Sequence, residues 1–235
     1  MSEISQFKPK YDPLNTDSPS TADRRNDDSL RGFMQRHMPL ESDAEMNRRN
    51  EILEDLQRVF KMWVREVAME VMGMNEDEAS DVGGLIFISG SHRLNVRDIG
   101  ADIDTICVAP RFCTREQFFT SLVKKLEVHP DITGLNAVES AAVPLIELDC
   151  RGIDIDFLFA QLGQNTVPDN LDILDDSVLT NLDESTEKSI NGPRVTDMIS
   201  KLVPNFDHFL ICLRVVRKWA KARGLYGNRF GYLGG

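Results

Sequence analysis

The sequence predicts an α/β (α+β) fold in which helices cover a mixed β-sheet. Apolar residues fall at helical spacing after Ser42, after Thr114 and again after Phe206. Short apolar runs rich in β-forming residues lie between the first two of these helices and return after residue 143. With 235 residues and 41% hydrophobic side chains, the chain can bury a substantial core.

Composition limits the classes of function. The net charge of -11 argues against strong nucleic-acid binding by this chain alone, because such affinity depends on Lys and Arg. If RNA is a substrate, most of the binding energy comes from elsewhere. The four cysteines lack metal-site spacing, which favours reduced, intracellular thiols. No apolar run approaches the roughly 20 residues of a membrane span, so we expect a soluble protein with no membrane partner.

The first third of the chain is expected to contain a disordered N-terminal segment and one long helix. Residues 1–31 are rich in Ser, Asp, Asn, Pro and Thr and show no apolar periodicity, which predicts disorder. A helix begins near Ser42, and the acidic stretch 75–81 is expected to be a connecting loop. The core stripe of this helix consists of Ile52, Leu56, Val59, Phe60, Trp63 and Val67.

A Gly-Ser turn and an Asp-x-Asp pair come next. Residues 85–88 form a predicted buried strand, and the Gly90-Ser91 turn after it opens a helix whose free amides suit a triphosphate. Asp102 and Asp104 are two residues apart in a strand and therefore face the same side. Two such carboxylates can share divalent cations, which favours nucleotidyl transfer. The alternative for an isolated Asp-x-Asp is a solvated strand end.

The middle of the chain predicts a covering helix and a hairpin. Pro110 ends the strand that bears Asp104, and the capping box Thr114-x-x-Gln117 begins an amphipathic helix. Residues 143–150 and 153–159 flank an Arg-Gly turn. The second strand places Asp154 and Asp156 on its polar face, where one of them could complete the metal site. The alternative is a solvated edge strand.

The last third is expected to be mainly helical. Residues 168–187 are interpreted as a solvated acidic connection rather than a second metal site, and residues 191–193 as a turn before a short helix. The helix over residues 206–223 carries an apolar stripe of Phe209, Leu213, Val216 and Ala220. An adjacent arc of Arg214, Arg217, Lys218 and Lys221 indicates either an anionic partner or a solvated helix face.

Five motifs together resemble those of eukaryotic nuclear poly(A) polymerases, within the DNA polymerase beta-like nucleotidyltransferases. Three are typical of the superfamily: Gly-Ser-His-Arg-Leu at 90–94, Gly-Ala-Asp-Ile-Asp at 100–104 and Gly-Ile-Asp-Ile-Asp at 152–156. The other two, at 191–197 and 217–228, are more specific to poly(A) polymerases. The resemblance runs from about Phe33 to Gly235.

This resemblance implies a nucleotidyltransferase palm over residues 32–165, followed by the start of a helical central domain over 166–235. It implies that Asp102, Asp104 and Asp156 hold Mg²⁺ or Mn²⁺ and are the catalytic residues. The residues implied to bind ATP are Ser89, Gly90, Ser91, Arg217, Lys221, Tyr226, Asn228 and Gly235. The implied reaction adds AMP from ATP to an RNA 3′ end in the nucleus, with mRNA 3′-end processing factors as partners.

Five residues depart from the family pattern. Ser89 replaces an aromatic residue, His92 a tyrosine, Asp98 a small neutral residue and Arg217 a lysine, and Glu147 replaces a lysine expected to contact RNA. Family members also continue past Gly235, so a truncated family member is expected. Three alternatives therefore stay open: a terminal uridylyltransferase or other terminal nucleotidyltransferase, a catalytically silent homologue acting as a binding module, and a stub without folded function.

Overall fold

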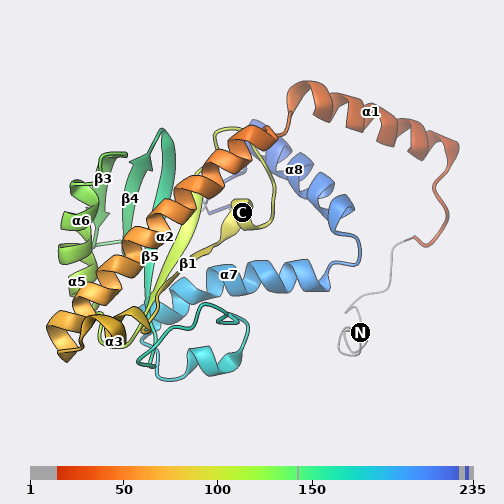
Figure 1. Cartoon of the computed structure of the whole chain (residues 1–235). Helices are drawn as coiled ribbons and strands as arrows, with labels where there is room; N and C mark the ends of the chain where they lie inside the picture. Colours follow the sequence, from red (N-terminus) through yellow and green to blue (C-terminus); the bar gives the residue numbers. More distant parts are fainter. Residues whose placement is uncertain (1–14, 142, 228–230, 233–235) are drawn as a thin grey trace.

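The fold is built on one mixed five-stranded sheet, shown in Figure 1. The computed structural model describes residues 15–141, 143–227 and 231–232. The strands are β1 (Leu85–Ile88), β2 (Ile103–Ala109), β3 (Ile132–Val138), β4 (Leu145–Cys150) and β5 (Ile153–Gln161), and their order in the sheet is β1-β2-β5-β4-β3. β2 and β5 pair in parallel, whereas the other neighbours are antiparallel. The predicted fold class is therefore confirmed.

Helices cover both faces of this sheet. In chain order they are α1 (Thr21–His37), α2 (Asp43–Met72), α3 (Glu76–Ser80), α4 (Gly90–Arg93), α5 (Arg115–Gln117), the π-helical segment η2 (Phe118–Leu122), α6 (Val123–Glu127), the 3₁₀ segment η3 (Asp176–Leu179), α7 (Glu184–Leu202) and α8 (Phe206–Ala222). Figure 1 shows α2 crossing one face, with α7 and α8 beyond the sheet on the opposite side. None of the helices in the described part of the chain has the length and apolarity to span a membrane.

The main core lies between the sheet and α2. Trp63 of α2 is 1% exposed and contacts the rings of Phe60, Phe118 and Phe159, while its indole N–H donates to Ser121 Oγ at 2.8 Å. The predicted alternation of β5 is confirmed, because its four odd-numbered apolar residues from 153 to 159 all belong to this core. The predicted stripe of α2 is confirmed as well, with Val59 partly buried against the same core.

A smaller core lies on the opposite face of the sheet. Ile106, Val108 and Ala160 project from β2 and β5 and pack with Ile190 of α7 and with the connection over residues 167–182. Because Asp104 and Asp156 also have even numbers in these two strands, their side chains lie on this second face. The helix α7 therefore covers the face that carries the predicted metal ligands.

The hairpin turn has the predicted geometry. Arg151 and Gly152 both have positive φ, 54° and 79°, as a two-residue type I′ turn requires. The strands it joins are antiparallel, with Cys150 opposite Ile153. The first strand begins at Leu145, two residues later than predicted.

Several predicted loops are instead regular structure. Part of the segment predicted to be disordered is helix α1, because Ser20 and Asp23 form a capping box and Asp27 pairs with Arg31 at 2.8 Å. The predicted loop 75–81 contains α3, whose amides are capped by Asn75. The predicted turn at 191–193 is wrong, since α7 begins at the Asp183 cap and continues through Pro193 to Leu202.

Candidate metal and nucleotide site

Three carboxylates converge at the edge of the parallel strand pair. Asp104 lies directly opposite Asp156 in the register of β2 and β5, and Asp102 precedes β2 by one residue. Each of the three offers a carboxylate oxygen, and these oxygens lie within 4.8 Å of one another. The hydroxyl of Thr105 donates to the Asp156 carbonyl at 2.8 Å, which ties the two strands together beneath the cluster. The donor set suits a hard divalent cation such as Mg²⁺ or Mn²⁺.

Burial, and then repulsion within the cluster, raise the pKa values of Asp104 and Asp156. Burial raises the pKa of Asp104, Asp102 raises it further, and Arg217 lowers it. The pKa of Asp156 is raised to about 6, first by burial and then by Asp104 and Asp102, with smaller contributions from Glu147 and Asp154. A bound divalent cation would relieve this repulsion, because it favours the charged form of each carboxylate.

The Gly-Ser turn lies directly against the cluster. The Ser89 amide donates to the Asp104 carbonyl at 2.8 Å, and α4 starts at Gly90 with φ 59°. A Cβ on Gly90 would lie 2.2 Å from Asp104 Oδ2, so only glycine fits here. The first amides of α4 have no acceptor within the helix. This geometry brings the N–H groups predicted to bind phosphate next to the predicted metal ligands.

The helix α7 holds α4 in place through residues that the sequence analysis did not connect. The Arg93 guanidinium makes two contacts with the Asp197 carboxylate, at 2.5 and 2.7 Å, and a third at 3.1 Å with the Ile88 carbonyl. A Cβ on Gly192 would lie at an ordinary contact distance of 3.5 Å from Ser89 Oγ, so α7 packs directly against the turn. Both α7 residues belong to the motif at 191–197, whose spacing gave no sign of these contacts.

His92 lines a small hollow together with a buried ion pair. Glu41 and Arg49 pair at 2.9 Å, with both side chains less than a tenth exposed. Burial lowers the pKa of His92, and the Arg49 charge lowers it further, although Glu41 opposes this. The imidazole is therefore neutral at pH 7. It adds no positive charge to the Gly-Ser turn.

The predicted phosphate and nucleoside residues of the C-terminal region gather at one place. The Arg217 guanidinium lies 5.9 Å from the centre of the Tyr226 ring, and Lys221 Nζ lies 5.1 Å from it. Arg217 is near enough to the carboxylates to lower the pKa of Asp104. Asn228 and Gly235, which the resemblance implies in nucleotide binding, lie outside the described residues.

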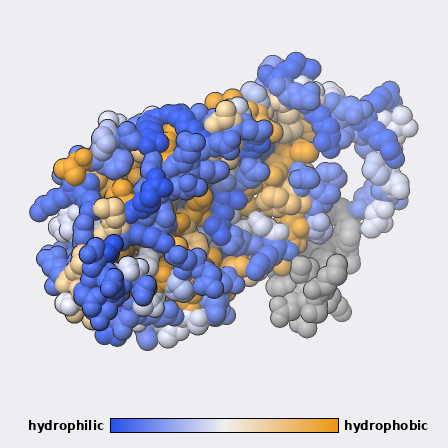
Figure 2. All heavy atoms as spheres, in the orientation of Figure 1, coloured by the Kyte–Doolittle hydropathy of each residue, from blue (hydrophilic) through white to orange (hydrophobic). Residues whose placement is uncertain are grey.

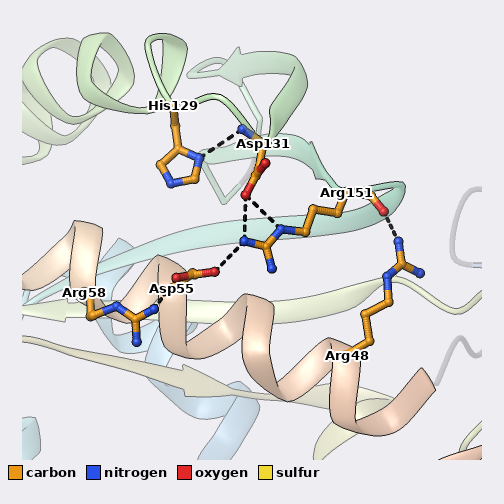
Figure 3. Close-up of polar contacts among 6 residues, drawn as sticks. All are labelled: Arg48, Asp55, Arg58, His129, Asp131 and Arg151. Carbon is orange, nitrogen blue, oxygen red and sulfur yellow. Dashed lines mark hydrogen bonds and ion pairs between the residues drawn. The ribbon is translucent and has the colours of Figure 1, made fainter. Parts of the chain in front are cut away.

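A polar network anchors the hairpin that leads into β5, as Figure 3 shows. Arg151 donates to Asp131 Oδ2 at 2.6 and 2.8 Å and to Asp55 Oδ2 of α2 at 2.6 Å. Arg48 of α2 donates to the Arg151 carbonyl, and Arg58 pairs with Asp55. This network fixes the start of the strand that carries Asp156. The contacts of Arg151 join segments that are far apart in the chain, so sequence spacing could not reveal them.

Comparisons with known proteins agree with this geometry. The family model described as poly(A) polymerase nucleotidyltransferase domain matches residues 12–203. A poly(A) polymerase of Dictyostelium discoideum is 41% identical over 225 residues, which are 95% of this chain and 28% of that protein. Nuclear poly(A) polymerase 1 of Arabidopsis thaliana is also 41% identical over 225 residues, 95% of this chain and 31% of that protein. The chain thus spans about 30% of the length of these relatives.

Solved structures share the fold at low sequence identity. The Cid1 poly(U) polymerase with MgGTP bound has a TM-score of 0.58 and is 12% identical, over 90% of this chain and 52% of that one. A cytoplasmic RNA terminal U-transferase has a TM-score of 0.56 and is 13% identical, over 90% and 49% of the two chains. These likenesses show a common nucleotidyltransferase fold.

Proposed function

The chain belongs to the family of poly(A) polymerase nucleotidyltransferase domains, and on this premise we propose that it transfers AMP from ATP to the 3′ hydroxyl of RNA. The observation that carries the proposal is the cluster of Asp102, Asp104 and Asp156 beside the Gly90-Ser91 turn. Poly(A) polymerases that are 41% identical to the chain support ATP as the nucleotide.

In the proposed mechanism, each group of residues has one task. Divalent cations held by Asp102, Asp104 and Asp156 would stabilise the attacking and leaving oxygens at the α-phosphate. The amides at Gly90 and Ser91 bind phosphate oxygens, as free N–H groups at a helix start do, and Ser89 orients this turn. The cations Arg217 and Lys221 bind the triphosphate. Tyr226, together with Asn228 and Gly235, holds the nucleoside.

The proposal also covers the domain boundaries, the cellular location and the approach of RNA. We assign residues 32–165 to the catalytic domain and residues 166–235 to the beginning of a helical central domain, of which α7 and α8 are part. Relatives named nuclear poly(A) polymerases support a nuclear location and a role in mRNA 3′-end processing with its protein factors. The RNA 3′ end approaches the polar face of β4 and β5. Glu147, directly opposite Asp156, makes this face unfavourable for phosphate.

Two rival functions give different results in one assay. Uridylyl transfer is favoured only by the shared fold of U-transferases, which carries no nucleotide preference to this chain. A catalytically silent binding module has no need of three converging carboxylates. Competition of UTP, GTP and CTP against ATP separates the first rival, and incorporation itself excludes the second.

Primer extension is the test. Because the relatives are longer, the chain is assayed both alone and in place of the matching segment of the Dictyostelium poly(A) polymerase. With Mg²⁺ or Mn²⁺, the hybrid protein should extend an RNA primer with ATP, and Asp104→Ala should abolish extension while the circular dichroism spectrum is kept. Asp154→Asn is the matched control, because Asp154 is exposed on the same strand outside the cluster. Retained turnover in Asp104→Ala would refute the assignment.

A further inference from the structure

Asp98 connects the catalytic sheet to α8. It lies in the loop between α4 and β2, and its backbone pairs with Leu40 just before α2. Its carboxylate reaches two arginines of α8 through different oxygens: Oδ1 lies 3.4 Å from Arg214 Nε, and Oδ2 lies 3.3 Å from Arg217 Nη1. One acidic side chain therefore pairs with two cations that are three residues apart on one helix.

The two arginines differ in how firmly they are held. Arg214 is 7% exposed and also donates to the Met38 carbonyl at 2.6 Å, so its position does not depend on Asp98 alone. Arg217 pairs with no carboxylate in the described part of the chain except Asp98, and its buried Nε finds no acceptor there. Arg217 thus has one acidic partner and spare donors.

These side chains border a cavity suited to an anion. The cavity has a volume of about 320 Å³ and is lined by the cations Arg214, Arg217, Lys218 and Lys221. Asp98 is the single carboxylate among its described lining residues. Asp98 also lines a small neighbouring hollow together with Asp102 and Ser91, which places this cavity beside the carboxylate cluster. Arg217 acts electrostatically on Asp104 from the same side. A polyphosphate that enters here meets Asp98 as its competitor.

We propose that Asp98 competes with the bound nucleoside triphosphate for Arg217, so that a phosphate oxygen takes the place of Oδ2 while Oδ1 keeps its contact with Arg214. This inference rests on the proposed function. In the nucleotide-free chain Asp98 balances the charges of α8 and holds the helix against the loop. The same contact lowers affinity for the triphosphate, because the pair with Arg217 must break before phosphate binds.

Calorimetric titration of the full chain with ATP and Mg²⁺, and separately with inorganic tripolyphosphate and Mg²⁺, tests the exchange. Asp98→Asn should bind both ligands about three- to tenfold more tightly, the range expected for release of a partly buried ion pair. In the Arg217→Gln background, Asp98→Asn should have no such effect. Asp154→Asn controls for the loss of one negative charge near the site.

A second comparison does not require Asp98 to be changed. Since Arg217 gives up a carboxylate on binding phosphate, whereas Lys221 pairs with no carboxylate in the described part of the chain, Arg217→Gln should weaken binding less than Lys221→Gln. Equal or greater weakening by Arg217→Gln would overturn the inference. So would unchanged or weaker binding by Asp98→Asn, or equal tightening with and without Arg217.

The outcomes also separate the inference from the function on which it rests. If the unmodified chain binds neither ligand, the inference and the proposed function are both refuted. If it binds both ligands, and Asp98→Asn has no effect that depends on Arg217, only the role of Asp98 fails.

Discussion

At Gly90, two features exclude a Cβ atom: the backbone conformation and the closeness of Asp104, a proposed metal ligand. The residue has φ 59°, and an added Cβ would lie 2.2 Å from Asp104 Oδ2. Gly90→Ala should therefore destabilise the fold by about 1–3 kcal/mol and displace Asp104 from the cluster. Urea denaturation and Mg²⁺-dependent ATP binding measure the two effects.

Gly100 supplies the matched control for this substitution. It has φ 69°, but no described atom lies within 4 Å of the Cβ that alanine would add. Gly100→Ala should destabilise the fold by only about 1 kcal/mol, because alanine is less stable than glycine in the left-handed conformation. It should leave ATP binding intact. If both variants lose ATP binding equally, backbone strain, rather than contact with Asp104, is the reason that position 90 requires glycine.

The raised pKa of Asp156 makes stability depend on pH in the metal-free chain. Its pKa is about 6 in the fold against an ordinary 3.8, so between pH 4 and 6 the folded state holds more protons than the unfolded state. The contribution of Asp156 to stability therefore falls as pH rises through this window and is level above it. Asp156→Asn should remove this loss, on the order of 1 kcal/mol for a partly exposed group.

Scanning calorimetry in chelator at pH 4 and pH 8 measures this effect. Relative to its value at pH 4, the Tm at pH 8 should be higher in Asp156→Asn than in the unmodified chain. Added Mg²⁺ at pH 8 should raise Tm in the unmodified chain but much less in the variant. Asp154→Asn should behave more like the unmodified chain. A variant that is less stable than the unmodified chain at pH 8 in chelator would contradict the sign.

The sequence could predict the residues of the cluster because strand periodicity is strictly local. Alternation alone placed Asp102 with Asp104 and put Asp156 on a polar face, and the structure brings all three together. The contacts of Asp98 with α8 could not be predicted, because 116 residues separate Asp98 from Arg214 in the chain. Charge reversal along α8 indicated an anionic partner. It did not show that Asp98 of the same chain already pairs with two of these cations.

At the scale of elements, the position of α4 depends on α7. The two-pronged contact of Arg93 with Asp197 joins them, and both side chains are only 25% exposed. Arg93→Gln should destabilise the fold by about 1–2 kcal/mol and weaken ATP binding, because α4 carries the amides that we propose bind phosphate. A double-mutant cycle with Asp197→Asn, measured by urea denaturation, isolates the pair.

The exposed pair of Asp27 and Arg31 on α1 is the control for this cycle. Both partners are about half exposed and lie within one helix. Arg31→Gln should leave both the denaturation midpoint and ATP binding unchanged. A cycle that finds no coupling between Arg93 and Asp197 would show that packing around Gly192, rather than the ion pair, positions α4.

Elements with strong local signals were predicted, and those decided by distant packing were not. The strand β1, the helix α2 and the hairpin turn follow from apolar periodicity and turn chemistry. The strand β3 was missed because its partner β4 supplies its hydrogen bonds, while Gly134 with φ 62° interrupts its pattern. The turn expected at Pro193 is absent, because helix α7 packs against β5 and tolerates the lost amide donor.

At the scale of the whole molecule, charge and apolar surface are distributed unevenly. The chain has a net charge of -11, yet cations concentrate on α8 around the proposed triphosphate cavity. Figure 2 shows apolar surface gathered over the region where Figure 1 places α8. Val216 is 58% and Trp219 54% exposed, and their spacing of three residues puts them on one side of the helix. Val216, a member of the predicted stripe, is therefore not part of the core.

The two tryptophans of the chain allow this surface to be tested, because Trp63 is buried and Trp219 is not. Acrylamide should quench only the Trp219 share of the fluorescence, and an apolar dye should bind the folded chain. The double variant Val216→Ser, Trp219→Gln should lose most of the dye signal and keep the denaturation midpoint within about 0.5 kcal/mol, as expected for exposed sites. A large fall in the midpoint would mean that these side chains stabilise the fold, and Trp219 shielded from acrylamide would mean that another surface already covers them.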